Sequence, residues 1–230
     1  MDPREIKDVA EALIRRIEFL QDAGITGLSR ASALKPAVPA IEGEPAEWVV
    51  FKGALKDAAN FSACAHQDWK GVLFGVWPLG KAVVLWGVPV GAQTIQSGPF
   101  GAEPLSQLES MLVWLAGELK SPVPLAANPE TILVARCPQD GGYTDTGAAV
   151  ACLGSLEPYL KGAQGVLLMG SLAAWAFLQS ADLDGARGRA HKASGRSLFV
   201  TYPPDDWITD QASKKAAHND LKLLIREIAS

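Results

Sequence analysis

Hydrophobic residues along the chain alternate between short continuous runs and longer stretches in which they recur at helical spacing. The runs are typical of strands buried on both faces of a sheet, and they span about 81–87, 131–136, 165–169 and 198–202. The helical spacing predicts helices at 105–115, 145–160, 171–179 and 211–228. Because strands alternate with helices, the pattern predicts an α/β fold with three α/β/α layers and a central four-stranded parallel sheet.

The first 80 residues are less regular than the rest. A capping box at Asp2 to Glu5, followed by apolar residues at helical spacing, predicts an N-terminal helix. Two apolar runs within 49–80 predict further strands, separated by a polar turn or a short helix. We predict a single domain over residues 1–230, made of this N-terminal helix and extended segment (1–80) and a core (81–230).

Ligands of parallel α/β sheets bind beyond the carboxyl ends of the strands. The segments that fall there are the glycine-rich stretch 87–101 and the stretches 136–144, 170–171 and 202–209. Gly75 to Ala82 nearly matches a phosphate-binding P-loop, but it precedes a strand and lacks the Ser or Thr that holds Mg²⁺. A plain turn is the better interpretation of that stretch. The sequence contains no G-x-S-x-G nucleophile elbow.

The composition is that of a folded protein. Of 230 residues, 48% are hydrophobic and 20% are charged, so a substantial core can form. No apolar run approaches the roughly 18 residues that cross a membrane, and we expect no membrane partner. The net charge of -4 argues against a strongly basic nucleic-acid binder. Three cysteines and the lack of an apolar leader favour a reducing, cytoplasmic environment.

A basic stretch precedes the fourth predicted strand. Arg187, Arg189 and Arg196 lie there in a glycine-containing hairpin. A solvated turn accounts for this stretch most simply. The alternative is a loop whose arginines contact phosphate groups.

Several segments of the core occur in an order and spacing known from one enzyme family. GRAH at 188–191 precedes GRSLFVTYPP at 195–204, and upstream lie WGVPVGAQ at 86–93, GPFG at 98–101 and TILVARC at 131–137. Over residues 81–228 the chain resembles the uracil-DNA glycosylase superfamily, above all its thermostable iron–sulfur (family 4) branch. The resemblance does not cover residues 35–80.

The resemblance implies a base-binding pocket at the carboxyl ends of the strands. Phe100 falls where the family stacks an aromatic ring on the flipped base. The other positions that the resemblance places around this pocket are Gly87, Gly91, Gln93, Pro99, Tyr202 and Asp205.

Three positions that carry the family's chemistry hold residues without that chemistry. Val88 stands where an acidic residue positions water, Leu133 where an asparagine reads the uracil edge, and Pro203 where a histidine stabilises the departing uracil anion. Base excision needs an activated water and a stabilised leaving group. Since these three side chains supply neither, we predict that the chain has no catalytic residues.

The cysteine positions are incomplete in the same way. Cys137 and Cys152 match the third and fourth cluster ligands of the family, whereas Ala23 and Thr26 replace the first two. An iron–sulfur cluster normally needs four thiolates, and Cys64 does not restore the count. We expect no cluster, no metal site and no other cofactor.

The leading hypothesis is a catalytically degenerate glycosylase-like protein that serves as a binding or scaffold module, with a protein partner from DNA repair or replication. Adjacent carboxylates at Asp205 and Asp206 predict weak DNA binding, because duplex DNA carries about one negative charge per 1.7 Å. Two alternatives stay open. One is an active glycosylase of altered specificity that uses Gln93, Tyr202 or Asp205. The other is an α/β small-molecule binding protein that uses the stretch 87–101.

Overall fold

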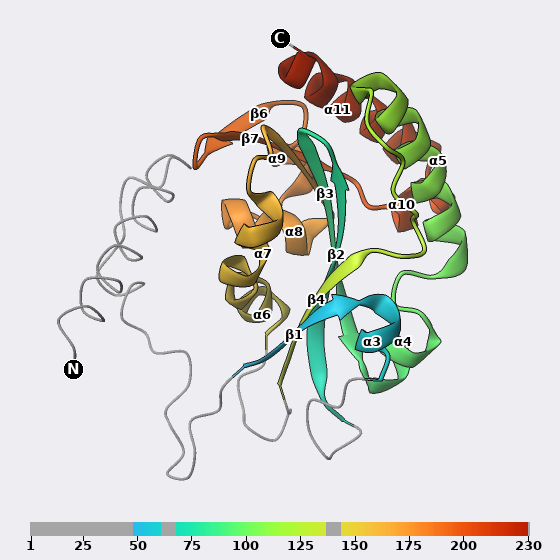
Figure 1. The fold of residues 1–230 in the computed structure, drawn as a ribbon, viewed down its shortest axis with the longest axis vertical. Coiled ribbons are helices and arrows are strands. Elements are labelled where there is room, and N and C mark those ends of the chain that lie inside the picture. The colour runs from blue at the N-terminus through green and yellow to red at the C-terminus, as the bar shows by residue number, and fades with distance from the viewer. Residues whose placement is uncertain (1–47, 61–67, 137–143, 230) are drawn as a thin grey trace, which may run out of the picture.

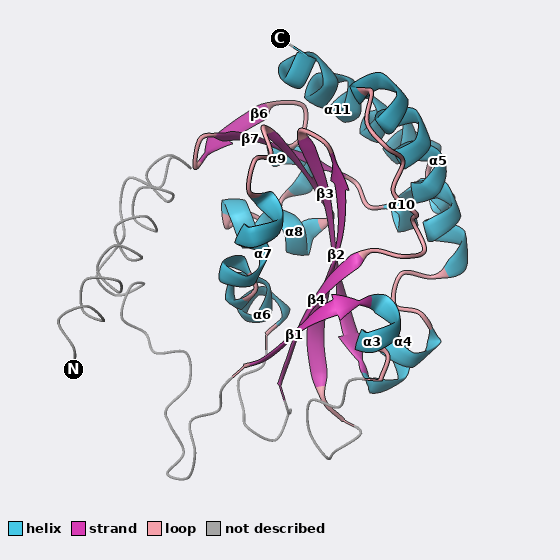
Figure 2. Ribbon diagram, viewed as in Figure 1, coloured by secondary structure: helices cyan, strands magenta, loops and turns pink. Residues whose placement is uncertain are grey.

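The computed structural model describes residues 48–60, 68–136 and 144–229. Within these ranges, seven strands form one mixed sheet in the order β1-β4-β2-β3-β5-β7-β6 (Figures 1 and 2). The strands are β1 Val49–Ala54, β2 Lys70–Leu79, β3 Ala82–Gly91, β4 Glu130–Arg136, β5 Gly165–Met169, β6 Ala190–Ala193 and β7 Arg196–Thr201.

The four strands predicted from the apolar runs are β3, β4, β5 and β7, and all four run in the same direction. β3, β5 and β7 are hydrogen-bonded to one another in parallel. The prediction of a four-stranded parallel sheet is nevertheless wrong, because β4 pairs with none of the other three. β2 lies between β3 and β4 and runs antiparallel to both, while β1 and β6 are antiparallel strands at the two edges.

The short turn between β2 and β3 explains the mixed sheet. Leu79 pairs with Ala82, so only Gly80 and Lys81 connect the two strands. Gly80 has a φ of +62, which suits the first position of a tight II′ hairpin turn. A two-residue connection can join only antiparallel neighbours. The stretch from Gly75 to Ala82 is therefore a hairpin and not a phosphate-binding loop.

Helices cover both faces of the sheet, so the α/β class is confirmed with a helical layer on each side (Figure 1). α6, α7, α8 and α9 pack on one face, and α4, α5, α10 and α11 pack on the other. Each face has its own hydrophobic core. Within the described residues the helices are α3 Leu55–Ala58, α4 Ala92–Ser97, α5 Ala102–Leu119, α6 Asp145–Ala151, α7 Leu153–Leu160, α8 Ser171–Leu178, α9 Leu183–Ala186, α10 Pro204–Thr209 and α11 Gln211–Ala229.

The helices predicted within the described core are present, with differences at particular points. The stretch 145–160 is two helices, α6 and α7, that meet at Cys152. The expected loop at 202–209 contains α10, which starts with Pro204 in its first turn. The glycine-rich stretch 87–101 is not one loop, because β3 continues to Gly91 and α4 follows directly.

Residues 49–79, which the resemblance to the glycosylases leaves out, contribute β1 and β2 to the sheet, so the two strands predicted within 49–80 are confirmed. The predicted N-terminal helix lies outside the described residues. No helix in the described ranges is long and apolar enough to cross a membrane.

Candidate functional site

Two of the three positions that the resemblance links to catalysis, Val88 and Leu133, lie in the sheet on either side of β2. Leu73 of β2 pairs with Val88 of β3 on one side and with Leu133 of β4 on the other. All three side chains belong to one buried cluster, and Leu133 has no exposed surface. Neighbouring strands lie about 4.8 Å apart. Leu73 therefore fills the space between the two positions where the glycosylases hold water and read the base.

The structure places Phe100 in the hydrophobic core and not on the wall of an open pocket. Its ring lies near those of Trp77 and Trp86, with centroid distances of 5.7 and 4.7 Å, and the residue is 2% exposed. Gly75 makes room for this cluster, because a Cβ there would lie 2.8 Å from Phe100 and 2.4 Å from Trp77. A ring enclosed in this way has no free face on which a base can stack.

Pro203 lies at the carboxyl ends of the parallel strands, next to Gly170. A Cβ on Gly170 would lie 3.6 Å from Cβ of Pro203 and 3.9 Å from the carbonyl oxygen of Gly87. Gly87 is itself covered, since a Cβ there would lie 2.8 Å from Phe74 and 3.2 Å from Leu172. Positions that the resemblance assigns to one pocket thus do meet, but apolar side chains occupy the space around them.

The remaining pocket positions are spread over separate elements. Gly91 lines a hollow of about 600 Å³ beside β3. Gln93 on α4 and Asp205 on α10 are exposed, and Pro99 is half-buried between α4 and α5. Tyr202 is half-buried after β7, and its hydroxyl donates to the Asp184 carboxylate.

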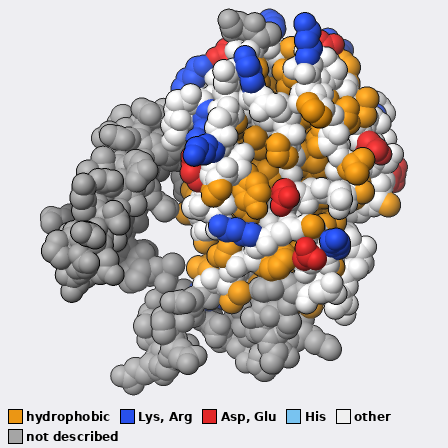
Figure 3. Space-filling view, viewed as in Figure 1, with side chains coloured by type: hydrophobic (Ala, Val, Ile, Leu, Met, Phe, Trp, Pro, Cys, Tyr) orange, Lys and Arg blue, Asp and Glu red, His pale blue; other side chains and the backbone are white. Residues whose placement is uncertain are grey.

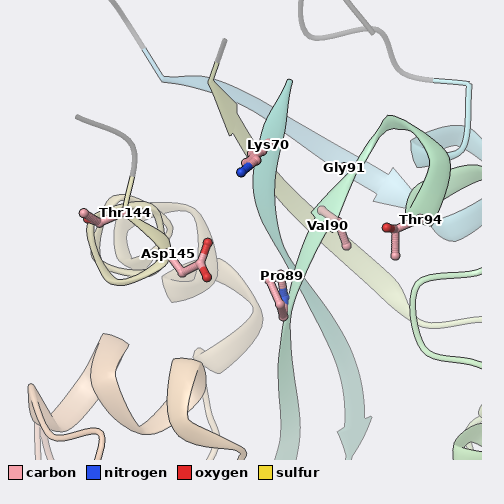
Figure 4. A pocket seen from close by; sticks show the side chains of 7 residues that line it. All are labelled: Lys70, Pro89, Val90, Gly91, Thr94, Thr144 and Asp145. Carbon is pink, nitrogen blue, oxygen red and sulfur yellow. The ribbon is translucent and has the colours of Figure 1, made fainter. Parts of the chain in front are cut away.

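The hollow beside Gly91 lies at the carboxyl end of β3 (Figure 4). Lys70 and Asp145 extend toward it from β2 and from the start of α6 (Figure 4). Lys70 pairs in register with Arg136 of β4, which is buried beside the Trp48 ring. Among the described residues that line the hollow, Asp145 is the single carboxylate, and none is a histidine or cysteine. Lys70, Asp145 and the two threonines are groups that can bind a polar ligand.

A buried carboxylate, Asp220 of α11, holds the end of β7 in place. It accepts hydrogen bonds from Nε of Arg187 at 2.9 Å, from Oγ1 of Thr201 at 3.0 Å and from the backbone nitrogen of Gly188 at 3.2 Å. Burial raises the pKa of Asp220, and Arg187 and the Thr201 hydroxyl counteract that rise. The Arg187 guanidinium also lies 4.1 Å from the centre of the Tyr202 ring. Arg187 and Tyr202 therefore belong to a structural network.

The other two arginines of the basic stretch differ in exposure. Arg196 donates to both carboxylate oxygens of Glu157, at 2.8 and 3.1 Å, and its side chain is 13% exposed. Arg189 is exposed and donates to the carbonyl oxygen of Gly185 at 3.0 Å. Of the three candidates for phosphate contact, Arg189 is the one without a carboxylate partner among the described residues.

Carboxylates crowd α10. Asp205 and Asp206 lie in its first turn, and Asp210 follows its last residue. Partial loss of solvent around the carboxyl group raises the pKa of Asp206 and also that of Asp205, although the Asp205 residue as a whole is exposed. In each case a neighbouring aspartate adds to the rise. Hydrogen bonds from Ser213 and from the backbone of α11 lower the pKa of Asp210. Both ends of α10 therefore present negative charge to any approaching phosphate.

We expect Asp205→Asn to raise the melting temperature at pH 7 and to leave it unchanged at pH 3. The pKa of Asp205 in the folded chain lies above its ordinary value of 3.8, so the folded state binds that proton more tightly than the unfolded state does. The stabilising contribution of this carboxyl group is therefore present below pH 3.8 and is lost as the pH rises through the folded-state pKa. Thermal unfolding between pH 3 and pH 7 measures the effect.

The matched control for that experiment is Asp57→Asn, which removes an exposed aspartate on α3. Equal melting temperatures of the wild type and Asp205→Asn at pH 7 would show that Asp205 carries no electrostatic cost.

Cys152 is a buried free thiol at the junction of α6 and α7, and burial raises its pKa. A buried thiol of raised pKa is a poor nucleophile and a poor metal ligand. Cys137, Ala23 and Thr26 lie outside the described residues, so the expected absence of an iron–sulfur cluster stays a prediction. In the part of the chain that the structure describes, no group of three or more His, Cys, Asp or Glu residues could hold a metal ion.

Comparison with known proteins does not extend these observations. No family model and no curated protein matches the chain. The resemblance to the glycosylases therefore rests on the motifs alone, and function has to be argued from the geometry.

The residues that decide the character of the site carried no functional signal in the sequence. Leu73 and Trp77 lie in a segment that the resemblance does not cover. Asp220 precedes Leu221, which belongs to the apolar stripe of the last helix. The strand β2 was predicted from its apolar run, but its pairing with β3 was not. The available signal for that pairing was the Gly80–Lys81 pair, because a glycine-containing pair between two apolar runs marks a hairpin. Nothing near Asp220 in the sequence points to Arg187 as its partner.

Proposed function

We propose that this chain is a catalytically inactive relative of the uracil-DNA glycosylases and serves as a binding or scaffold module. The observation that carries the proposal is the filled space between β3 and β4, where Leu73 separates Val88 from Leu133. A glycosylase must admit a flipped base and place an activated water beside it. The side chains at these positions leave no room for the base and provide no group for the water.

The partner proposed for this module is a protein of DNA repair or replication, the setting of the family that the chain resembles. Direct DNA binding should be weak. Arg187 and Arg196 are engaged by carboxylates, and α10 carries Asp205 and Asp206 in its first turn. Phosphate groups that approach α10 are repelled by these carboxylates, and this repulsion lowers the affinity for DNA.

The purified chain is expected to release no uracil, hypoxanthine or xanthine from single- or double-stranded oligonucleotides. Removing one preorganised stabilising group costs about a hundred- to a thousandfold in rate, and three positions are changed here. Alkaline cleavage of end-labelled oligonucleotides measures the abasic product, with an active uracil-DNA glycosylase as positive control. Turnover that disappears in Gln93→Ala or Asp205→Ala would show a recruited catalytic group and overturn the proposal.

Small-molecule binding is the second candidate function, because the hollow of Figure 4 includes Pro89, Val90, Gly91 and Thr94 from the glycine-rich stretch. Its volume of about 600 Å³ falls within the range of roughly 300–1,000 Å³ for small-molecule sites. A thermal-shift screen of anionic and polar metabolites tests this role. A ligand that stabilises the wild type and not Lys70→Ala would favour it over the scaffold role.

A further inference from the structure

A groove runs between α5 and α11, on the face of the sheet that also carries α10 (Figure 1). It consists of a smaller hollow of about 200 Å³ and a wider, more open one beside it. The two hollows share Trp114 and His218, whose ring centroids lie 4.8 Å apart. The apolar side chains that line the groove are Met111, Trp114, Trp207, Ala217, Leu221 and Ile225.

We infer that this groove binds a short acidic segment of a partner protein, with one large apolar side chain of that segment in the smaller hollow. The inference rests on the proposed role as a binding module, and it names the surface that the module uses and the chemistry of its partner.

The size of the smaller hollow favours a single side chain. Its volume of about 200 Å³ is below the roughly 300–1,000 Å³ of typical small-molecule sites. Trp114 lies half-buried between the two hollows. Tryptophan in such a position is the residue type that most often dominates the affinity of protein interfaces.

Trp207 carries a buried hydrogen-bond donor beside the smaller hollow. Trp207 is 4% exposed, and its indole nitrogen has no hydrogen-bond acceptor among the described residues. Leaving a buried N–H without an acceptor is unfavourable. Since Trp207 lines the smaller hollow, its indole N–H signal reports on a segment that binds there.

The charges along the groove fit an acidic segment. Lys214 lies at the smaller hollow and Lys222 and Arg226 at the wider one, against a single acidic residue, Glu118. In Figure 3, hydrophobic side chains lie close to Lys and Arg side chains on the upper part of the molecule, over α5 and α11. The chain as a whole has a net charge of -4. The residues that line the groove have the opposite balance, because cations outnumber anions among them.

The spacing of these cations sets the length of the segment. Twelve residues separate Lys214 from Arg226 on α11, which is about 18 Å at 1.5 Å per residue. An extended chain covers that distance in about five or six residues. The expected ligand therefore has acidic residues at both ends and an apolar residue between them.

A single-stranded nucleic acid fits the groove less well. Bases need open aromatic faces, whereas much of the floor is formed by Met111, Ala217 and Leu221. A segment with an apolar side chain matches this floor better than a row of stacked bases does.

Fluorescein-labelled hexapeptides test the inference by anisotropy titration of the full chain. Each peptide has two aspartates at either end and a central pair of leucines, phenylalanines or glycines, and one further leucine peptide carries lysines in place of the aspartates. The acidic leucine or phenylalanine peptide is expected to bind saturably, and the glycine and lysine peptides are not. The indole N–H signal of Trp207 should move during the productive titration.

Charge reversal at the groove provides the decisive variants. Lys222→Glu/Arg226→Glu changes two exposed residues. The double variant should lower the affinity for the acidic peptide by about tenfold or more. Lys52→Glu/Lys56→Glu alters the net charge equally at exposed positions on β1 and α3, and should leave the affinity unchanged. Trp114→Ala should also abolish binding, and the charge variants decide the matter if that variant does not fold.

The inference is overturned if neither acidic peptide binds, if the groove variant and its control bind equally, or if a twelve-residue oligothymidylate binds more tightly than the peptides. If the peptides do not bind and the chain excises no base, the proposed scaffold role remains, but this groove is not the surface that it uses. Base excision by the chain would remove the scaffold role whatever the peptides do.

Discussion

Replacing Phe100 with alanine is expected to lower the free energy of unfolding by about 3–5 kcal/mol, the usual cost of truncating a fully buried aromatic side chain. Trp77 and Trp86 contact its ring, and Gly75 leaves no side chain that could move into the resulting cavity. Small domains have a total stability of about 5–15 kcal/mol. The loss is therefore large enough to measure by urea denaturation with tryptophan fluorescence.

The control for Phe100→Ala is Leu125→Ala, which truncates an apolar side chain that is 65% exposed. Its effect should stay within about 0.5 kcal/mol. In an open glycosylase pocket, Phe100 would be held on one face only and its loss would cost little. A change below about 1 kcal/mol for Phe100→Ala would mean that the ring is not part of the core.

Asp220→Ala is expected to destabilise the fold by about 3–5 kcal/mol, because breaking a buried ion pair leaves the other charge without compensation. Arg187, Thr201 and Gly188 each lose an acceptor, and the Arg187 side chain is only 14% exposed. The Asp184 carboxylate lies 3.9 Å from Arg187 and can take over part of the pairing. This places the expected loss at the lower end of the range.

Glu157→Ala is the matched control for Asp220→Ala. Glu157 also pairs with an arginine, Arg196, but its own side chain is 60% exposed, and exposed pairs contribute about 0–1 kcal/mol. Equal losses in the two variants, measured by the same denaturation, would contradict the central place of Asp220 in the fold.

The strands that apolar runs can identify were predicted well, because continuous burial on both faces leaves a continuous apolar sequence. Val83 and Val84 in β3, like Leu167 and Leu168 in β5, are nearly or fully buried although they point to opposite faces. The direction of these strands was also predicted correctly, since helices connect β4 to β5 and β5 to β7.

The order of the strands could not be predicted in the same way. The apolar runs of β2 and β4 look alike in sequence, and local sequence does not determine which strands become neighbours in the sheet. The Gly80–Lys81 turn fixes β2 against β3, but the second edge of β2 is assigned to β4 by long-range packing. Gly71 permits that close approach, because a Cβ there would lie 2.5 Å from the carbonyl oxygen of Val134.

The candidate site could likewise be predicted only in part. The apolar side chains of Val88, Leu133 and Pro203 are given by the sequence, and they already argued against base excision. The filling of the pocket was not readable, because Leu73 and Trp77 come from the segment without resemblance and reach the site only through the pairing of β2.

Nuclear Overhauser effects among the methyl groups of Leu73, Val88 and Leu133 test most directly whether β2 fills the space between β3 and β4. Residues opposite one another on adjacent antiparallel strands have Cβ atoms about 4.5–5.5 Å apart, whereas residues two strands apart are separated by roughly 9–10 Å. The register of the sheet predicts strong effects from Leu73 to Val88 and to Leu133. Direct effects between Val88 and Leu133, with none from Leu73 to either, would contradict the placement of β2 and would make β3 and β4 neighbouring parallel strands.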